Sequence, residues 1–150
     1  MKVLEQPLGR DAFDAHAVLR RELGGRRALA LDESLYEPGG LRRIIAAEAA
    51  DEVVVKPMFC GGLLAARVLV KRASAAGLAV SITHALESLV GRLGALHLAC
   101  ATLPEDGPAC GLDLGELWPH ATLWDGPAIT RPPSPGLGDR LAALTKARAL

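Results

Sequence analysis

Three charged side chains, Glu5, Asp32 and Lys56, each stand at the end of a short apolar run. Two carboxylates that converge on one place repel each other unless a hard cation such as Mg²⁺, which prefers oxygen ligands, neutralises them. A lysine near that cation, and shielded from water, has a lowered pKa and exchanges protons efficiently. A metal that holds a substrate carboxylate also stabilises the dianion formed when the adjacent carbon loses its proton. The three residues therefore indicate Mg²⁺-assisted or Mn²⁺-assisted proton abstraction next to a carboxylate, with Glu5 and Asp32 as ligands and Lys56 as the catalytic group.

Each of these residues also has a simpler interpretation. A salt bridge at a strand end would account for Glu5 or Lys56, and a helix N-cap would account for Asp32 or Ser34. A lysine at the end of a barrel strand can instead form a Schiff base with a carbonyl substrate, as in a class I aldolase. The metal hypothesis is favoured because the polar residues recur at matched positions of successive structural units.

The units that position these residues are four short apolar runs, each followed by a helical pattern. The runs end in Glu5, Asp32, Lys56 and His84, at intervals of 27, 24 and 28 residues. This spacing is typical of βα units with short loops. Near-continuous apolar strands that alternate with helices predict a parallel sheet covered by helices, whose C-terminal strand ends form the functional face. The sequence thus predicts an α/β fold with four βα units over residues 1–103.

The helical patterns have recognisable ends. The first pattern closes on Gly24, the third stops at Gly77 and the fourth stops at Pro104, as helix C-termini prefer. Leu64 and Val68 lie at positions i and i+4 of the third pattern, which predicts a shared apolar face. The predicted helices span residues 10–23, 41–50, 63–76 and 87–103.

Residues 104–150 differ in composition from the rest of the chain. They contain seven of the ten prolines and both tryptophans. The apolar side chains of Leu112 and Trp118 favour a segment that packs on the same domain over a disordered tail. We expect this Pro-rich and Gly-rich segment to supply the last strand or strands and a terminal helix over residues 139–150.

The overall composition excludes several functional classes. Half of the 150 residues are hydrophobic, and the 17 basic and 17 acidic residues cancel, which predicts one domain with a sizeable core and argues against nucleic-acid and membrane partners. No apolar run is long enough to span a bilayer, and the first residues lack a signal-peptide pattern. Cys60, Cys100 and Cys110 form no CxxC pair, so we expect them to be small buried hydrophobes in a reducing cytoplasm.

Four motifs, in chain order, carry a resemblance to a known family. VLEQPL, LALDES, VVVKPMFCGGL and ITHALES resemble the successive motifs of the enolase superfamily, in its muconate-lactonizing subgroup. LPEDGPACGL and PSPGLG are most similar to the o-succinylbenzoate synthases of menaquinone biosynthesis. The resemblance covers nearly the whole chain and implies the C-terminal half of a TIM-like (β/α)₇β barrel, beginning at its fourth strand. The implied activity is that of a Mg²⁺-dependent lyase, which dehydrates a cyclohexadiene carboxylate to o-succinylbenzoate through an enolate intermediate.

The resemblance also implies a role for each charged strand end. Glu5 and Asp32 would be the second and third metal ligands, and Glu33 would support them from outside the coordination shell. Lys56 would be the sixth-strand lysine, which faces one side of the substrate. In racemases of the subgroup that lysine is an acid and base, whereas in the synthases its charge stabilises the enolate.

Contacts with the small-molecule carboxylate substrate are implied for two further segments. The turn at Gly61 and Gly62 would let the backbone approach the substrate, and Thr83 and His84 would contact its distal carboxylate. The sequence departs from the synthases at the second segment, because synthases often carry a serine run where this chain has Thr83, His84 and Ala85.

Other catalytic parts that the resemblance implies fall outside this chain. They are a second-strand lysine, a third-strand aspartate ligand and an N-terminal capping domain. We therefore expect an incomplete enzyme: a fragment of a longer one, a chain whose barrel a partner chain or homo-oligomer completes, or an inactive remnant. An N-acylamino-acid racemase or dipeptide epimerase, with the same metal and lysine chemistry, is the alternative to the synthase.

Overall fold

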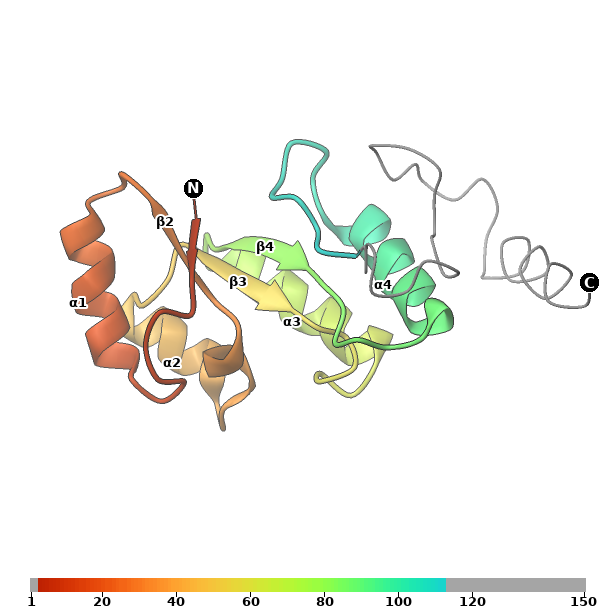
Figure 1. Cartoon of the computed structure of the whole chain (residues 1–150), viewed down its shortest axis with the longest axis horizontal. Coiled ribbons are helices and arrows are strands. Elements are labelled where there is room, and N and C mark those ends of the chain that lie inside the picture. Colours follow the sequence, from red (N-terminus) through yellow and green to blue (C-terminus); the bar gives the residue numbers. More distant parts are fainter. Residues whose placement is uncertain (1–2, 113–150) are drawn as a thin grey trace, which may run out of the picture.

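The computed structural model of the chain describes residues 3–112. Its four strands form one sheet in the order β1-β2-β3-β4, and every neighbouring pair is parallel (Figure 1). This arrangement confirms the predicted α/β class with parallel strands. The predicted terminal helix at residues 139–150 lies outside the described residues. The strands are β1 (Val3–Glu5), β2 (Ala28–Leu31), β3 (Glu52–Val55) and β4 (Ala79–Ile82).

A helix follows each strand, as in successive βα units. The first helix is capped by Gly24, which adopts the left-handed conformation and donates hydrogen bonds to the carbonyls of Arg20 and Arg21, a common helix C-cap. No helix within residues 3–112 is long and apolar enough to cross a bilayer. The helices are α1 (Phe13–Leu23), α2 (Gly40–Ala47), α3 (Leu63–Ala75) and α4 (Leu89–Thr102), with a 3₁₀ helix, η1 (Glu33–Tyr36), between β2 and α2.

The two faces of the sheet differ in character because successive side chains of a strand point to opposite sides. On one face, buried Leu31, Val53 and Ile82 pack with residues of the helices in a single core, and α2 and α3 lie behind the strands in Figure 1. The other face carries small and polar side chains. Ladder partners place Ala30 beside Glu52, and Val54 beside Ser81, on that second face. The helix-covered face supplies the apolar core, whereas Ala30, Glu52, Val54 and Ser81 of the second face are buried but include polar side chains.

Leu64 and Val68 lie on α3 at helical spacing, but they are 80% and 50% exposed and do not form its packed face. The buried face consists of Ala66, Val70 and Ala73, whose small alanines let the helix lie close to the sheet. The expectation that the three cysteines are buried is wrong, because Cys100 is exposed on α4 and Cys60 and Cys110 are only partly buried.

Tyr36 completes the hydrogen bonding of β3 where its neighbour leaves the sheet. The last residue pair between β2 and β3 is Leu31 with Val53, so the following peptide groups of β3 need another partner on that side. The Tyr36 hydroxyl donates to the Val54 carbonyl at 2.9 Å and accepts from the Lys56 amide at 2.5 Å. Burial raises the pKa of Tyr36 well above its ordinary value, so the hydroxyl remains a donor.

The orientation of α3 predicts opposite responses at two valines of one helix. Val70→Ala should lower the free energy of unfolding by about 2 kcal/mol, because it empties a packed site. Val68→Ala should change it by less than about 0.5 kcal/mol, because that side chain is half exposed. Urea denaturation of both variants measures the difference, and equal losses would contradict the described orientation.

The Tyr36 bridge predicts a local effect on the backbone of Lys56. Tyr36→Phe keeps the ring but leaves two partly buried peptide groups unpaired, so the free energy of unfolding should fall by about 1–3 kcal/mol. Amide hydrogen exchange at Lys56 should become faster. Phe59→Leu is the control. The Phe59 ring packs edge-on against the Tyr36 ring, with 5.4 Å between the ring centres, but Phe59 takes no part in the bridge. Unchanged exchange at Lys56 in Tyr36→Phe would show that the bridge does not hold this strand end.

Candidate metal and catalytic site

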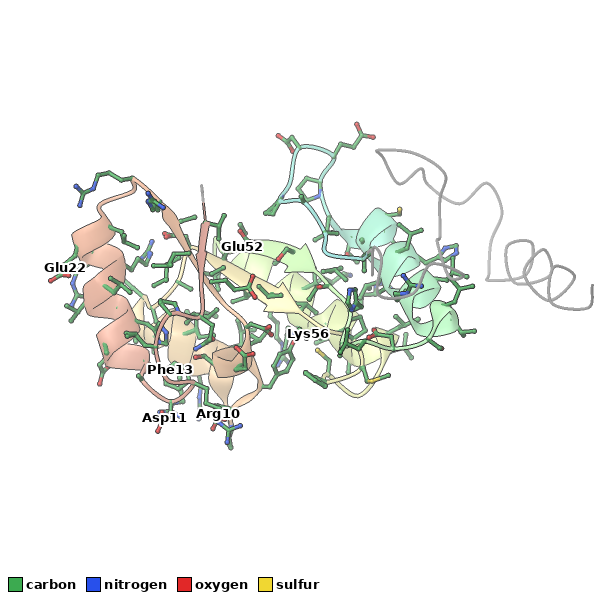
Figure 2. All side chains as sticks on the ribbon, viewed as in Figure 1. Arg10, Asp11, Phe13, Glu22, Glu52 and Lys56 are labelled. Carbon is green, nitrogen blue, oxygen red and sulfur yellow. The ribbon has the colours of Figure 1, made fainter. Side chains whose placement is uncertain are left out.

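The structure brings the predicted polar residues to one edge of the sheet. Glu5 is the last residue of β1, Asp32 and Lys56 directly follow β2 and β3, and Thr83 directly follows β4. Because all four strands are parallel, these positions share the C-terminal edge. Figure 2 shows Lys56 beyond the arrowhead of β3, with Glu52 at the opposite end of the strand.

Asp32 and Lys56 form an ion pair that is largely shielded from water. Lys56 Nζ donates a hydrogen bond to Asp32 Oδ2, and the two side chains are 17% and 4% exposed. Burial raises the pKa of Asp32, while the hydrogen bond and positive charge of Lys56 oppose that rise. The other oxygen, Oδ1, is buried and accepts no hydrogen bond from any residue in the range 3–112. An unpaired carboxylate oxygen in a buried place is costly, and a bound cation is one way to satisfy it.

Glu5 brings a second carboxylate to the same edge. It is more exposed than Asp32, yet its pKa is also raised, first by partial burial and next by the negative charge of Asp32. Lys56 opposes the rise. A hard cation between the two acids would remove their mutual repulsion.

The donor set fits Mg²⁺ as a partial site. Residues 3–112 contain no group of three or more His, Cys, Asp or Glu side chains that could hold a metal ion. Mg²⁺ is nevertheless commonly bound by one or two carboxylates and completes its shell with water and substrate oxygens. Glu5 and Asp32, with the unpaired Oδ1, supply the oxygen donors that such a site requires.

Two further acids lie close enough to Glu5 to raise its pKa. Glu33 is exposed at the start of η1, and its charge contributes to the raised pKa of both Asp32 and Glu5. Glu52 is buried and was not predicted. Ala30 pairs with Glu5 on one side and with Glu52 on the other, so the two glutamates lie in one row of the second face. Period-two alternation back from Lys56 through Val54 would have indicated Glu52 as a residue of that face.

The predicted glycine turn connects β3 to α3. Gly61 and Gly62 have φ angles of +85° and +105°, which residues with a side chain rarely adopt. No described atom lies within 4 Å of a Cβ built on either residue. The same loop carries Phe59, whose ring centre lies 5.7 Å from Lys56 Nζ. Backbone conformation, rather than crowding within residues 3–112, accounts for both glycines.

Thr83 and His84 link β4 to the segment that returns beside it. The Thr83 hydroxyl donates to the Gly111 carbonyl at 2.6 Å, and Gly111 forms an isolated parallel bridge with Thr83. His84 Nδ1 accepts a hydrogen bond from the Leu86 amide at 3.1 Å, which places the proton of a neutral ring on Nε2. The substrate contacts implied for these residues stay predictions.

Gln6 is a second residue that sequence reasoning missed. Its side chain hydrogen-bonds the backbone of Asp32, directly beside the candidate metal ligands. The available signal was a polar residue between a strand-ending acid and Pro7, which is too common to identify a site.

Comparison with known proteins supports the resemblance inferred from the motifs. The family model for enolase C-terminal domain-like proteins matches residues 1–143. The chain is 34% identical over 141 residues to the N-succinyl-L-Arg/Lys racemase of Bacillus cereus, covering 90% of this chain and 36% of the racemase. It is 36% identical over 129 residues to the o-succinylbenzoate synthase of Thermobifida fusca, covering 86% of this chain and 38% of the synthase.

Solved structures agree with these sequence matches. The Bacillus cereus N-succinyl Arg/Lys racemase superposes with a TM-score of 0.62 at 35% identity, over 66% of this chain and 26% of the racemase. A muconate cycloisomerase from Azorhizobium caulinodans gives 0.62 at 32% identity, over 67% of this chain and 28% of that enzyme. The chain spans little more than a third of the length of the curated relatives it matches. Together with the parallel sheet and its polar C-terminal edge, the match over residues 1–143 shows that the chain belongs to the enolase C-terminal domain-like family of the enolase superfamily.

Proposed function

We propose that this chain carries the metal-binding and lysine part of an enolase-superfamily active site. Glu5 and Asp32 would bind Mg²⁺, with Mn²⁺ as a substitute. Lys56 would be the catalytic group when the carbon next to a substrate carboxylate loses its proton. The observation that carries this proposal is the buried Asp32 carboxylate, which pairs with Lys56 through one oxygen and leaves the other unpaired. When bound, Mg²⁺ would hold the substrate carboxylate and offset the negative charge that develops on it.

The remaining steps, which are orientation, charge stabilisation and contact with the substrate, would fall to different residues of the chain. Lys56 is held by its backbone at Tyr36 and by its ammonium at Asp32, so its Nζ is oriented before substrate binds. A preoriented ammonium stabilises negative charge without the reorganisation that water would need. Glu33 would strengthen the negative field around the cation, and the Gly61–Gly62 turn would present backbone to the substrate.

For the reaction, we propose dehydration of a cyclohexadiene carboxylate to o-succinylbenzoate, a lyase step in cytoplasmic menaquinone biosynthesis. The motifs near the C-terminus and the 36% identity to the Thermobifida fusca synthase support it. N-acylamino-acid racemisation is the second candidate, since the Bacillus cereus racemase matches at 34% identity. For either reaction, further barrel units would come from a longer protein or a partner chain.

The metal proposal predicts Mn²⁺ binding that depends on Asp32. Asp32→Asn keeps the shape of the side chain but removes its charge, so the Kd should rise at least about tenfold, or ~1.4 kcal/mol. Glu5→Gln should also weaken binding. Glu22→Gln is the matched control, because Glu22 is exposed on α1, far from the site in Figure 2. Titration followed by the electron paramagnetic resonance signal of free Mn²⁺ measures each Kd, and an unchanged Kd in Asp32→Asn would contradict the assignment.

The reaction proposal predicts a difference between two substitutions of Lys56. In a synthase the lysine supplies charge, so Lys56→Met should lose about 10²–10⁴-fold in kcat, and Lys56→Arg, which keeps the charge, should lose less. In a racemase the lysine moves a proton, so both variants should lose activity alike, because arginine does not release its proton.

The assay uses protein purified from its own cells, so that any further barrel units are retained. The cyclohexadiene carboxylate tests dehydration, and N-succinylated amino acids in D₂O test exchange of the α-hydrogen. We expect formation of o-succinylbenzoate. Exchange and racemisation without dehydration would overturn the synthase assignment in favour of the second candidate.

A further inference from the structure

Gln6 lies where β1 leaves the sheet, and its backbone there is unusual. Its φ angle is +37°, a region that residues with a side chain rarely occupy. The backbone amide of Gln6 still donates a hydrogen bond to the Ala30 carbonyl at 2.9 Å. Gln6 therefore remains attached to β2, although regular pairing ends one residue earlier. Such a conformation persists only where the surrounding contacts hold it in place. The side chain of Gln6 provides those contacts.

The carboxamide of Gln6 is fully used. Its Oε1 accepts hydrogen bonds from the amide of Asp32 at 3.0 Å and from the amide of Ser34 at 3.2 Å. Its Nε2 donates to Ser34 Oγ at 2.9 Å and to the Leu8 carbonyl at 3.1 Å. A primary amide has two acceptor positions and two donor hydrogens, and all four have partners here. This degree of satisfaction fixes the position of the side chain.

These bonds place Gln6 in the role of a missing strand residue. The last pair between β1 and β2 is Glu5 with Ala30, so Asp32, two residues further, has no main-chain partner from β1. Oε1 of Gln6 takes the place of a strand carbonyl and accepts the Asp32 amide. In the same way, the Tyr36 hydroxyl accepts a hydrogen bond from the amide of Lys56, the residue that follows β3. At both strand ends, a side chain extends the ladder to the residue that carries the reactive group.

We propose that Gln6 is a positioning residue for the cation site. Gln6 is covalently next to Glu5 and hydrogen-bonded to the backbone of Asp32, so it fixes the backbones of both carboxylate residues relative to each other. The inference rests on the proposed function, in which those two carboxylates bind the metal. Residues that orient metal ligands without touching the metal contribute strongly to metal affinity.

Three substitutions separate positioning from general stabilisation. Gln6→Ala removes all four side-chain hydrogen bonds. Gln6→Glu keeps an oxygen that can accept the amides of Asp32 and Ser34. Ser34→Ala removes the bond between Nε2 and Oγ but leaves the bond to Asp32 intact. A purely structural role for Gln6 would make metal affinity follow the loss of stability in each variant.

The measured quantities are the Mn²⁺ Kd, the urea midpoint of the metal-free protein and amide hydrogen exchange at Asp32. We expect Gln6→Ala to raise the Kd about 10–100-fold and to speed exchange at Asp32. Gln6→Glu should bind Mn²⁺ at least as tightly as the wild type, because it keeps the acceptor oxygen and adds a negative charge beside the cation. Ser34→Ala should lower the urea midpoint with little change in Kd.

Different outcomes overturn different statements. If the wild type binds Mn²⁺ and Gln6→Ala binds it equally well, or if the Kd follows the urea midpoint across all three variants, the positioning role is wrong while the metal site stands. If the wild type binds no Mn²⁺, the proposed metal site fails and the inference fails with it. Unchanged exchange at Asp32 in Gln6→Ala would overturn the positioning role without reference to any metal.

Discussion

The ion pair between Lys56 and Asp32 joins the ends of β2 and β3 at the C-terminal edge of the sheet, and the candidate site is built around it. Burial raises the pKa of Asp32 and the Lys56 ammonium opposes that rise, so each charge stabilises the other where either alone would be costly. The pair is incomplete as a purely structural contact, because Oδ1 of Asp32 is buried without a hydrogen-bond donor among residues 3–112. A buried carboxylate with one oxygen paired to Lys56 and the other without a donor retains an oxygen that can bind a further cation.

The two faces of the sheet that carries this pair have different roles. Apolar side chains such as Val53 and Val55 pack against the helices and supply the burial that stabilises the fold. The alternate side chains point to the other face, where Glu5 and Glu52 lie in one row. Because the strands are parallel, their C-terminal ends meet at one edge, and the chemistry gathers there rather than being spread over the surface.

Periodicity and polarity predicted the strands and the charged residues that end them, because those features depend on local sequence. The packed face of α3 was not predicted. Leu64 and Val70 both belong to apolar sets with helical spacing, so the sequence alone does not show which set faces the sheet. The structure shows that the set with the small residues does. Gln6 and Tyr36 were missed for a related reason. Apart from the bond between Gln6 and Leu8, their hydrogen bonds join residues 18–28 positions apart and arise only once the strands diverge.

The central claim is that Glu5 and Asp32 bind one cation beside Lys56, and anomalous X-ray diffraction from crystals grown with Mn²⁺ tests it most directly. The account predicts an anomalous peak that is in contact with an oxygen of each carboxylate, with Oδ1 of Asp32 among the ligands. It also predicts that Lys56 Nζ stays on the same side of the sheet edge, within reach of a substrate oxygen. An anomalous peak elsewhere, or none at the C-terminal edge of β1 and β2, would contradict the claim.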